Sequence, residues 1–426
     1  MVQRMTRVHS KATFPVMTSR AADIGSSRPS VNALDTDGPP ESDDDLFVGG
    51  ATARLEKRMG LGPPNQNNVI RRAVLVVILG WFPLALFTAI NDLLSPGHSF
   101  LTFLSDYGVH ARSLVAAPLL VLAEVIASRR LGALSKHLRM SGVVHDGDVP
   151  RLDEVVQRMH RLRDSFLVEL AIVILVLAFI GGFLYLTPLN ALPAWNSSAL
   201  TLSGHSVAGW WHTLVSVPIL LMVVCGWVWR IFLWASLLFR VSRLRLEIVA
   251  SHPDGAGGLK FLGLSLQEFS IVAFGLGMIV SGTIANQVLY HGASIVDFQY
   301  GLAGFAVLIV FLFAGPLFVF FPKLLEAKSV GIIHYGGLAR AFGQEFEREW
   351  FSRSGKFAGD DLRDPMFSST TDLYSIVANA FGMRLLPLAW SNLLVLATGA
   401  MLPFLPVALM SIPADVILDQ ARKLLF

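Results

Sequence analysis

The chain has 426 residues, of which 53% are hydrophobic and 15% are charged, and its formal net charge is +3. A soluble protein of this length would have about 25% charged residues, so the composition excludes an ordinary soluble domain and favours long lipid-facing segments. The small net charge gives no reason to expect a nucleic-acid partner. The single cysteine, Cys225, excludes an intrachain disulfide and a CxxC redox pair.

Residues 1–65 are predicted to form a disordered cytoplasmic tail. The first 50 residues are rich in Ser, Asp, Pro and Gly, and such a composition cannot bury enough apolar surface to fold. The tail contains no apolar region typical of a signal peptide. The alternative is that it results from an upstream start and has no function.

Seven segments are apolar and long enough to cross about 30 Å of hydrocarbon, which takes roughly 20 helical residues. They lie near 73–94, 113–129, 165–187, 211–237, 266–290, 299–321 and 386–411. Pro403 and Pro406 make the last segment the best candidate for a broken or re-entrant helix, because proline removes a helical hydrogen bond. The predicted fold is therefore an all-α polytopic transmembrane helix bundle of about seven spans over 66–411, and no internal repeat is evident.

Lys and Arg residues orient these spans. They concentrate before the first span and in the loops at 130–164, 238–265 and 322–385. The alternate loops are nearly bare, since 95–112 contains only Arg112 and neither 188–210 nor 291–298 contains any. Because basic residues mark cytoplasmic loops, this pattern predicts a cytoplasmic N-terminus.

The segments outside the predicted spans contain further elements. Residues 150–164 and 323–351 have helical spacing of apolar residues, whereas 353–371 is predicted to be a polar linker. Residues 412–426 are predicted to form an amphipathic C-terminal tail on the outer surface. Aromatic residues typical of a membrane interface fall at the predicted outer edge, namely Trp195, Trp210, Trp211 and Tyr290.

A first candidate site is the intramembrane charged set, formed by Glu124, Glu169, Arg230 and Glu268. All four lie near the inner ends of predicted spans. A charged residue within a span costs roughly 2.5–3.5 kcal/mol or more, and such residues usually pair or face a cavity. This set therefore predicts an inner-leaflet ion or proton site. The alternative is that the four residues reach the interface and pair with nearby arginines.

A second candidate site is the outer polar set, formed by Asn91, Asp92, His212, Asn286, Gln287 and His291. Asp92, His212, Asn286 and His291 are its best candidates for lining an outer vestibule. No HxxH or HExxH spacing accompanies the histidines, so no metal site is predicted. The alternative is that these residues only end their helices at the headgroups.

A third candidate site is the glycine loop, Ser251-His252-Pro253-Asp254-Gly255-Ala256-Gly257-Gly258. Its glycines permit positive φ, and its N–H groups precede the fifth span, where they could hold an anion. His252 and Asp254 could act as an acid–base pair. The alternative is a tight turn in which Asp254 caps the next helix. The loop contains no GK[ST] motif, and no dinucleotide, haem or kinase motif occurs, so no cofactor is predicted.

Seven stretches of the sequence form a recognisable pattern. They are Phe103–Asp106 with His110–Arg112, Pro118–Leu120 through Glu124, Arg161–Ser165, Trp210-Trp211 through Pro218, His252–Leu259, Met383-Arg384 before Pro387, and Leu402-Pro403 through Pro406. Together they resemble an uncharacterised family of bacterial polytopic inner-membrane proteins that carry an HPDxAGGL loop. The resemblance runs from about residue 70 to the end and implies a bacterial cytoplasmic membrane location. It implies no activity, substrate or catalytic residue.

The leading functional hypothesis is a transporter or channel-like protein, based on charges within spans, proline-broken helices and the lack of a large extramembrane domain. The alternatives are a membrane-embedded enzyme that uses His252 and Asp254 at the cytoplasmic face, and a scaffold or sensor that acts through its cytoplasmic helices. The expected partner is the lipid bilayer, with a homo-oligomer left open. The sequence does not indicate a substrate.

Overall fold

The computed structural model describes residues 66–94, 98–187, 193–197, 204–352 and 365–410. Within these residues 84% are helical and no strand is formed, which confirms the all-α prediction. The predicted tails at 1–65 and 412–426 lie outside the described residues. So does most of the predicted linker at 353–371, although α14 begins within it, at Pro365.

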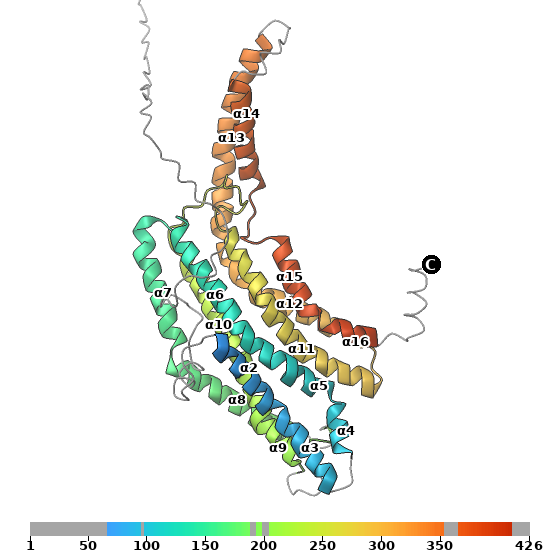
Figure 1. Cartoon of the computed structure of the whole chain (residues 1–426). Coiled ribbons are helices and arrows are strands. Elements are labelled where there is room, and N and C mark those ends of the chain that lie inside the picture. The colour runs from blue at the N-terminus through green and yellow to red at the C-terminus, as the bar shows by residue number, and fades with distance from the viewer. Residues whose placement is uncertain (1–65, 95–97, 188–192, 198–203, 353–364, 411–426) are drawn as a thin grey trace, which may run out of the picture. The chain divides into compact units, whose positions relative to one another are not determined.

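The first half of the described chain contains four long apolar helical stretches, which are drawn from blue to light green in Figure 1. Two of these stretches begin with a short α-helix, α5 or α9. Each short helix continues through a π-helical segment into a longer α-helix. The elements are α2 (Gln66–Gly80), α3 (Phe82–Leu94), α4 (Ser99–Leu104), α5 (Tyr107–His110), π-helical η1 (Ala111–Ala116), α6 (Ala117–Met140), η2 (Asp146–Asp148), α7 (Val149–Arg163), α8 (Phe166–Leu186), α9 (Val207–Trp211), π-helical η4 (His212–Ser216) and α10 (Val217–Val241).

The second half adds two long stretches and a bent pair. The elements are η5 (Lys260–Leu264), α11 (Ser265–His291), η6 (Ile295–Phe298), α12 (Gln299–Ala314), η7 (Gly315–Phe320), α13 (Phe321–Ser352), α14 (Pro365–Gly382), α15 (Trp390–Met401) and α16 (Phe404–Met410). Helix α13 runs out of the bundle and forms an antiparallel hairpin with α14 (Figure 1). The sequence predicted the α13 half of this hairpin and missed α14.

Six helices in the described residues are long and apolar enough to cross a membrane, or seven if the bent pair counts as one span. The second is 34 residues long, from Tyr107 to Met140, so its helix extends beyond the predicted span of 113–129 at both ends. The chain is therefore a multi-pass α-helical membrane protein.

The last apolar segment is broken, as its prolines predicted. Helices α15 and α16 meet at an angle of 52°, and the break lies against α11. The Ser281 hydroxyl donates to the Pro403 carbonyl oxygen at 2.5 Å, and a side chain at Gly277 would collide with the carbonyl oxygen of Ala400. The small-residue row of Ala273, Gly277 and Ser281 is therefore a helix-packing face.

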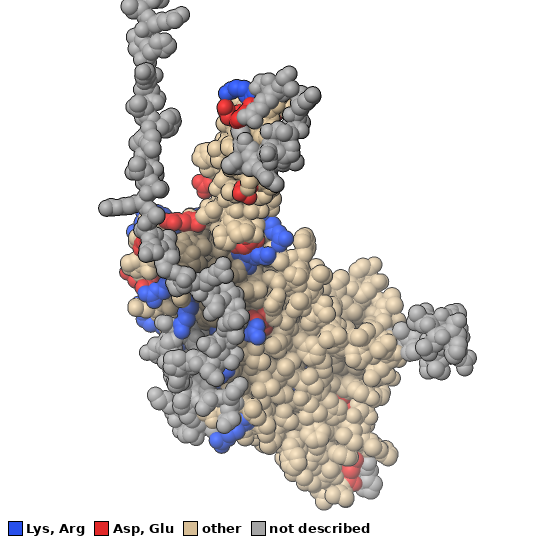
Figure 2. Space-filling view, turned by 45° about the horizontal axis from the view of Figure 1, so that its top comes forward, with Lys and Arg blue, Asp and Glu red and all other residues tan. Residues whose placement is uncertain are grey.

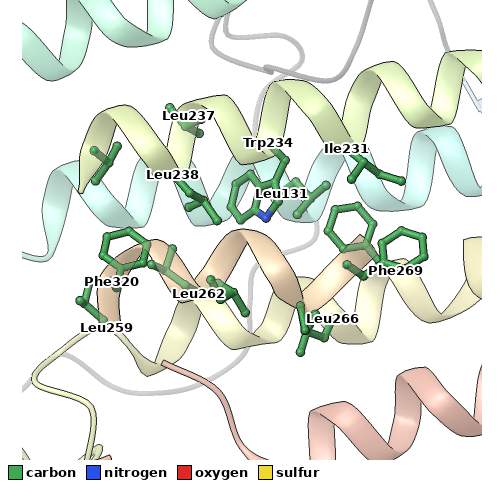
Figure 3. Close-up of a cluster of buried hydrophobic side chains, with 14 of the residues drawn as sticks. Leu131, Ile231, Trp234, Leu237, Leu238, Leu259, Leu262, Leu266, Phe269 and Phe320 are labelled. Atoms are coloured by element: carbon green, nitrogen blue, oxygen red, sulfur yellow. The ribbon is translucent and has the colours of Figure 1, made fainter. Parts of the chain in front are cut away.

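The main core joins α6, α10, α11 and η7. Figure 3 shows α10 side chains pointing toward those of η5 and α11, with Phe320 of η7 at one end. The ring centroids of Phe269 and Phe313 are 5.0 Å apart, and Trp234 is 1% exposed. This packing fixes α11 against the two helices that begin with a π-helical segment.

Charged side chains gather toward one end of the visible face, above a broad band with almost none (Figure 2). We call this end the basic side. It is formed by the ends of α6 and α10, by α7 and by the starts of η5 and α13, and its basic residues include Arg130, Arg139, Arg151, Arg245, Lys260 and Lys323. The opposite end, where α5 and α9 begin and α8 and α11 end, is called the far side.

Candidate functional site

A cavity of about 500 Å³ opens among the helix ends on the far side. Its polar lining comes from η1, η4, α11 and the segment before α9, and includes Arg112, Asn196, His212, Thr213 and Asn286. Its apolar lining comes mainly from α8 and α10, and includes Phe179, Ile180, Phe183 and Val217. We call it the far-side cavity. Its volume falls within the range of about 300–1,000 Å³ found for small-molecule sites.

Asp106 holds the wall of this cavity together. It is 6% exposed and caps α5 by accepting a hydrogen bond from the backbone N–H of Val109 at 3.0 Å. Its carboxylate also accepts from Nε1 of Trp195 at 2.9 Å and from Nδ2 of Asn286 at 2.8 Å. These three donors compensate the burial of its charge, so Asp106 is a structural residue that positions Trp195 and Asn286.

Arg112 brings a positive charge to the cavity. It is the second residue of η1 and is partly buried. Within the described residues its guanidinium makes no hydrogen bond or ion pair, and Asp106 acts on it only through space. A charge in a membrane span is normally paired or faces a cavity. Arg112 lines the far-side cavity.

Four further buried polar atoms at this cavity have no hydrogen-bond partner within the described residues. They are Asn196 Oδ1, His212 Nδ1, Thr213 Oγ1 and Asn286 Oδ1. Thr213 is 2% exposed and Asn196 is 3% exposed. An unpaired buried polar atom costs about 1–3 kcal/mol. A ligand or water that fills the cavity would recover this energy.

Two of the four residues predicted to line an outer vestibule, His212 and Asn286, line the far-side cavity. Asp92 does not, because its carboxylate accepts hydrogen bonds from the backbone N–H groups of Ser99 and Phe100 at 2.8 and 2.9 Å and so caps α4. His291 is the final residue of α11.

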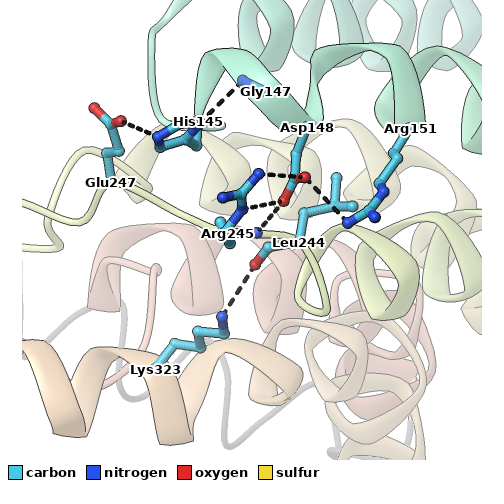
Figure 4. A network of polar contacts seen from close by, with 8 residues as sticks. All are labelled: His145, Gly147, Asp148, Arg151, Leu244, Arg245, Glu247 and Lys323. Atoms are coloured by element: carbon cyan, nitrogen blue, oxygen red, sulfur yellow. Dashed lines mark hydrogen bonds and ion pairs between the residues drawn. The ribbon is translucent and has the colours of Figure 1, made fainter.

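On the basic side, Asp148 organises the loops that follow α6 and α10 (Figure 4). It is 1% exposed and accepts from Nε and Nη2 of Arg245 at 3.1 Å each and from the backbone N–H of Arg245 at 2.9 Å. Arg151 adds a fourth donor at 3.2 Å. The side-chain and backbone bonds from Arg245 hold the pKa of Asp148 well below its ordinary value.

The glycine loop forms a closed turn around Asp254. Its carboxylate accepts hydrogen bonds from the backbone N–H groups of Ala256, Gly258 and Lys260 at 2.8–3.1 Å. Partial burial raises the pKa of Asp254, but these bonds outweigh it, and the pKa lies below its ordinary value. The N–H groups that the sequence offered for an external anion are therefore occupied by the loop's own carboxylate.

The same loop borders a cavity of about 730 Å³ on the basic side. His252 lies beside Asp254, with 2.9 Å between Nδ1 and Oδ1. His137 and Lys260 line the cavity with them. Gly255, Gly257 and Gly258 have φ values of 66°, 65° and 93°, so the turn requires glycine at all three positions.

The structure divides the intramembrane charged set. Glu124 pairs with Arg230 and also with Arg72, at 3.2 Å from the latter. Glu268 pairs instead with Arg130, at 3.0 Å. Glu169 lies in the first turn of α8.

Arg72 and Arg230 hold Glu124 from two different helices. The side chains of Glu124, Arg72 and Arg230 are only 12–14% exposed, and no cavity described above contains them. These contacts tie α2, α6 and α10 together and give no geometry for a shared ion or proton site.

Sequence reasoning missed Arg112 as a site residue, because the second span was taken to begin at residue 113. One signal was present. Arg112 is the only Lys or Arg in the three predicted outer loops. A single basic residue that departs from the charge pattern suggests a specific role at its position. Among the described residues, no group of three or more His, Cys, Asp or Glu side chains could hold a metal ion.

No family model, curated protein or solved structure matches this chain.

Proposed function

We propose that this multi-pass membrane protein is a transporter that binds a small organic anion in the far-side cavity. The observation that carries the proposal is Arg112, a partly buried cation without a hydrogen bond or ion pair within the described residues, beside four unpaired buried polar atoms. Arginine is suited to carboxylate and phosphate groups because its N–H donors form a planar fork.

The rest of the lining narrows the ligand class. The oxygens of Asn196 and Asn286 are acceptors, so they favour a ligand that carries a hydroxyl or amino donor besides its anionic group. Phe179, Ile180 and Phe183 give the cavity an apolar wall, which suits an apolar body. A hydroxy acid with a hydrocarbon or aromatic substituent has all three features.

We further propose that the basic side faces the cytoplasm of a bacterial cell and that the far-side cavity opens toward the exterior. The Lys and Arg residues on one side of the bundle support this orientation. Cysteine labelling at Ser198 and Ser354, in a Cys225→Ser background, tests it. Labelling of Ser354 by an impermeant reagent in intact cells would reverse the orientation.

Binding of mandelate to the full chain in nanodiscs tests the proposed function. We expect calorimetry to detect mandelate and not its neutral amide. The Arg112→Gln variant should weaken binding by roughly 10- to 100-fold, because a hydrogen bond to a charged group contributes about 1.5–3 kcal/mol. Uptake of labelled mandelate into proteoliposomes should fall in parallel.

Arg129→Gln is the matched control. Arg129 lies on α6, the continuation of the same helix, and is exposed at the basic side. The control removes the same charge and should leave binding unchanged. Equal binding by Arg112→Gln and wild type would refute the anion site.

A second candidate function is a membrane-embedded enzyme on the basic side. The observation that favours it is the His252–Asp254 pair, which borders a cavity together with Lys260 and His137. A histidine oriented by a carboxylate is suited to general acid–base catalysis. Metabolite and lipid profiling of a deletion strain, complemented with Asp254→Asn or with Arg112→Gln, separates the two functions. Loss of rescue by Asp254→Asn alone would favour the enzyme.

A further inference from the structure

Two parts of the chain have the same order of elements at a spacing of 100 residues. Asp106 caps α5, and Ser206 caps α9 through a hydrogen bond from the backbone N–H of Gly209 at 2.9 Å. Each short helix runs into a π-helical segment, at Ala111–Ala116 and at His212–Ser216. Each π-helical segment is followed by a long α-helix with proline as its second residue, at Pro118 and Pro218.

The amino acids agree at the same spacing. Residues 112–120 read RSLVAAPLL and residues 212–220 read HTLVSVPIL. Four of these nine positions are identical, and Ser/Thr, Ala/Ser and Leu/Ile are conservative pairs. The same spacing pairs Arg130 with Arg230 further along the two helices. Neither composition nor helix propensity requires π-helical segments at matching places, since such segments are rare.

The two parts are also joined to one another at both ends. After α6 and α10 the chain forms an antiparallel bridge between Val144 and Leu246. On the far side, Trp195 joins the two caps. Its Nε1 donates to Asp106 at 2.9 Å, and its carbonyl oxygen accepts from the Ser206 hydroxyl at 2.7 Å.

We propose that residues 66–140 and 166–241 are two copies of one helical hairpin, and that the anion is held between Arg112 of the first copy and His212 of the second. The inference rests on the proposed function and deepens it. Both residues line the far-side cavity, and they occupy the same position in their copies. Ligand sites of membrane transporters commonly lie where internal repeats meet.

The copies differ at the cavity. In the first copy Gly80 lies against Ser113, and a Cβ built on it would be 3.9 Å from the Cβ of Ser113. The same spacing pairs Gly80 with Ile180 and Ser113 with Thr213, and both of these line the cavity. The second copy therefore has a branched side chain where the first has glycine, and its Thr213 hydroxyl has no hydrogen-bond partner within the described residues.

Exchange of the two recognition residues tests the proposal. The Arg112→His variant should bind mandelate about tenfold more weakly than the wild type, as expected for the loss of a charged hydrogen-bond donor. Adding His212→Arg to the same chain should restore the affinity to within about threefold, because the arginine returns at the equivalent position of the other copy.

A second arginine position supplies the control. Gln287 also lines the cavity but belongs to α11, outside both copies. The Arg112→His/Gln287→Arg variant restores the same charge at a non-equivalent position and should remain weak. Equal rescue by both arginines, or no rescue by His212→Arg, would overturn the equivalence.

The measurements separate the two proposals. Weak binding by the exchanged variant, in a wild-type chain that binds mandelate and not its amide, overturns the paired site alone. No binding of mandelate by the wild type overturns the proposed function and, with it, the role of the pair. Size-exclusion profiles and melting temperatures of all variants show whether each chain is folded.

Discussion

The polar groups of the basic side and of the far side differ in how far the protein satisfies them. Asp148 and Asp254 accept seven hydrogen bonds between them from the chain itself. The far-side cavity instead contains Arg112 and four buried atoms that have no such partner within the described residues. Folding alone explains satisfied polar groups, whereas unsatisfied ones need another reason to be retained. The difference supports structural roles for Asp148 and Asp254 and the ligand binding proposed for the far-side cavity.

The largest effect on stability should come from Asp148→Ala. The substitution removes the acceptor that joins the loop after α6 to the loop after α10, and it leaves the donors of Arg245 and Arg151 without their partner. We expect the largest fall in melting temperature among the variants described here. Asp146→Ala, at an exposed neighbouring position, is the control. A melting temperature equal to that of the control would show that the region is not structural.

Asp254→Asn should loosen the glycine loop. An amide cannot accept from three backbone N–H groups as strongly as a carboxylate, and we expect a loss of about 1.4 kcal/mol, equivalent to a tenfold rise in local opening. Hydrogen exchange of the amides of Ala256, Gly258 and Lys260 measures this rise. Unchanged exchange would mean that the turn does not depend on the carboxylate.

Ser216→Ala and Thr213→Val compare a hydroxyl that has a hydrogen-bond partner with one that has none, within the same π-helical segment of the described chain. The Ser216 hydroxyl donates to the carbonyl oxygen of Gly80 at 2.9 Å, so its loss should cost about 1 kcal/mol of stability. The Thr213 hydroxyl has no hydrogen-bond partner in the part of the chain that the structure describes, so Thr213→Val should leave the melting temperature unchanged or raise it, while mandelate binding weakens. A destabilising Thr213→Val would contradict the assignment of its hydroxyl to the ligand.

The smallest effect is a dependence of stability on acid. The pKa of Asp148 is lower in the folded chain than its ordinary value of 3.8, because Arg245 donates side-chain and backbone hydrogen bonds to the carboxylate. Its contribution is therefore complete above that value and declines as the pH falls toward the folded pKa. Melting temperatures between pH 6 and pH 3 should fall less steeply for Asp148→Asn than for the wild type. Parallel curves would exclude this carboxylate as the cause.

Much of the fold could be predicted from the sequence, because a bilayer constrains composition strongly. The length of the apolar segments predicted about seven spans, of which six are long helices, and Pro403 and Pro406 predicted that the last is broken. The helix of the second span extends beyond the predicted limits, because hydropathy falls at Arg112 whereas the helix continues through it. Helix α14 was missed because its first residues, Pro365 to Ser369, are typical of a linker.

The far-side cavity could be predicted only in part. His212 and Asn286 were identified because they are polar residues near the ends of apolar segments. Arg112 was assigned to a loop and Asp92 to the vestibule, since pairing across the bundle depends on how helices pack. The repeat was overlooked because its copies share few identical residues outside the nine positions that begin at Arg112 and His212.

The two π-helical segments also bear on the order of two evolutionary events, the insertion of one residue into a helix and the proposed duplication of the hairpin. A π-helical turn closes its hydrogen bond over one residue more than an α-helical turn, so it is the form that a helix takes when a single residue is inserted. In both copies the segment follows the short capped helix and ends two residues before the proline, at Ala116 and at Ser216. One insertion in an ancestral hairpin accounts for both, whereas separate insertions would have to coincide. Under the proposed duplication, the extra residue is therefore older than the pairing of the two hairpins, and we expect a relative with a single hairpin to contain it.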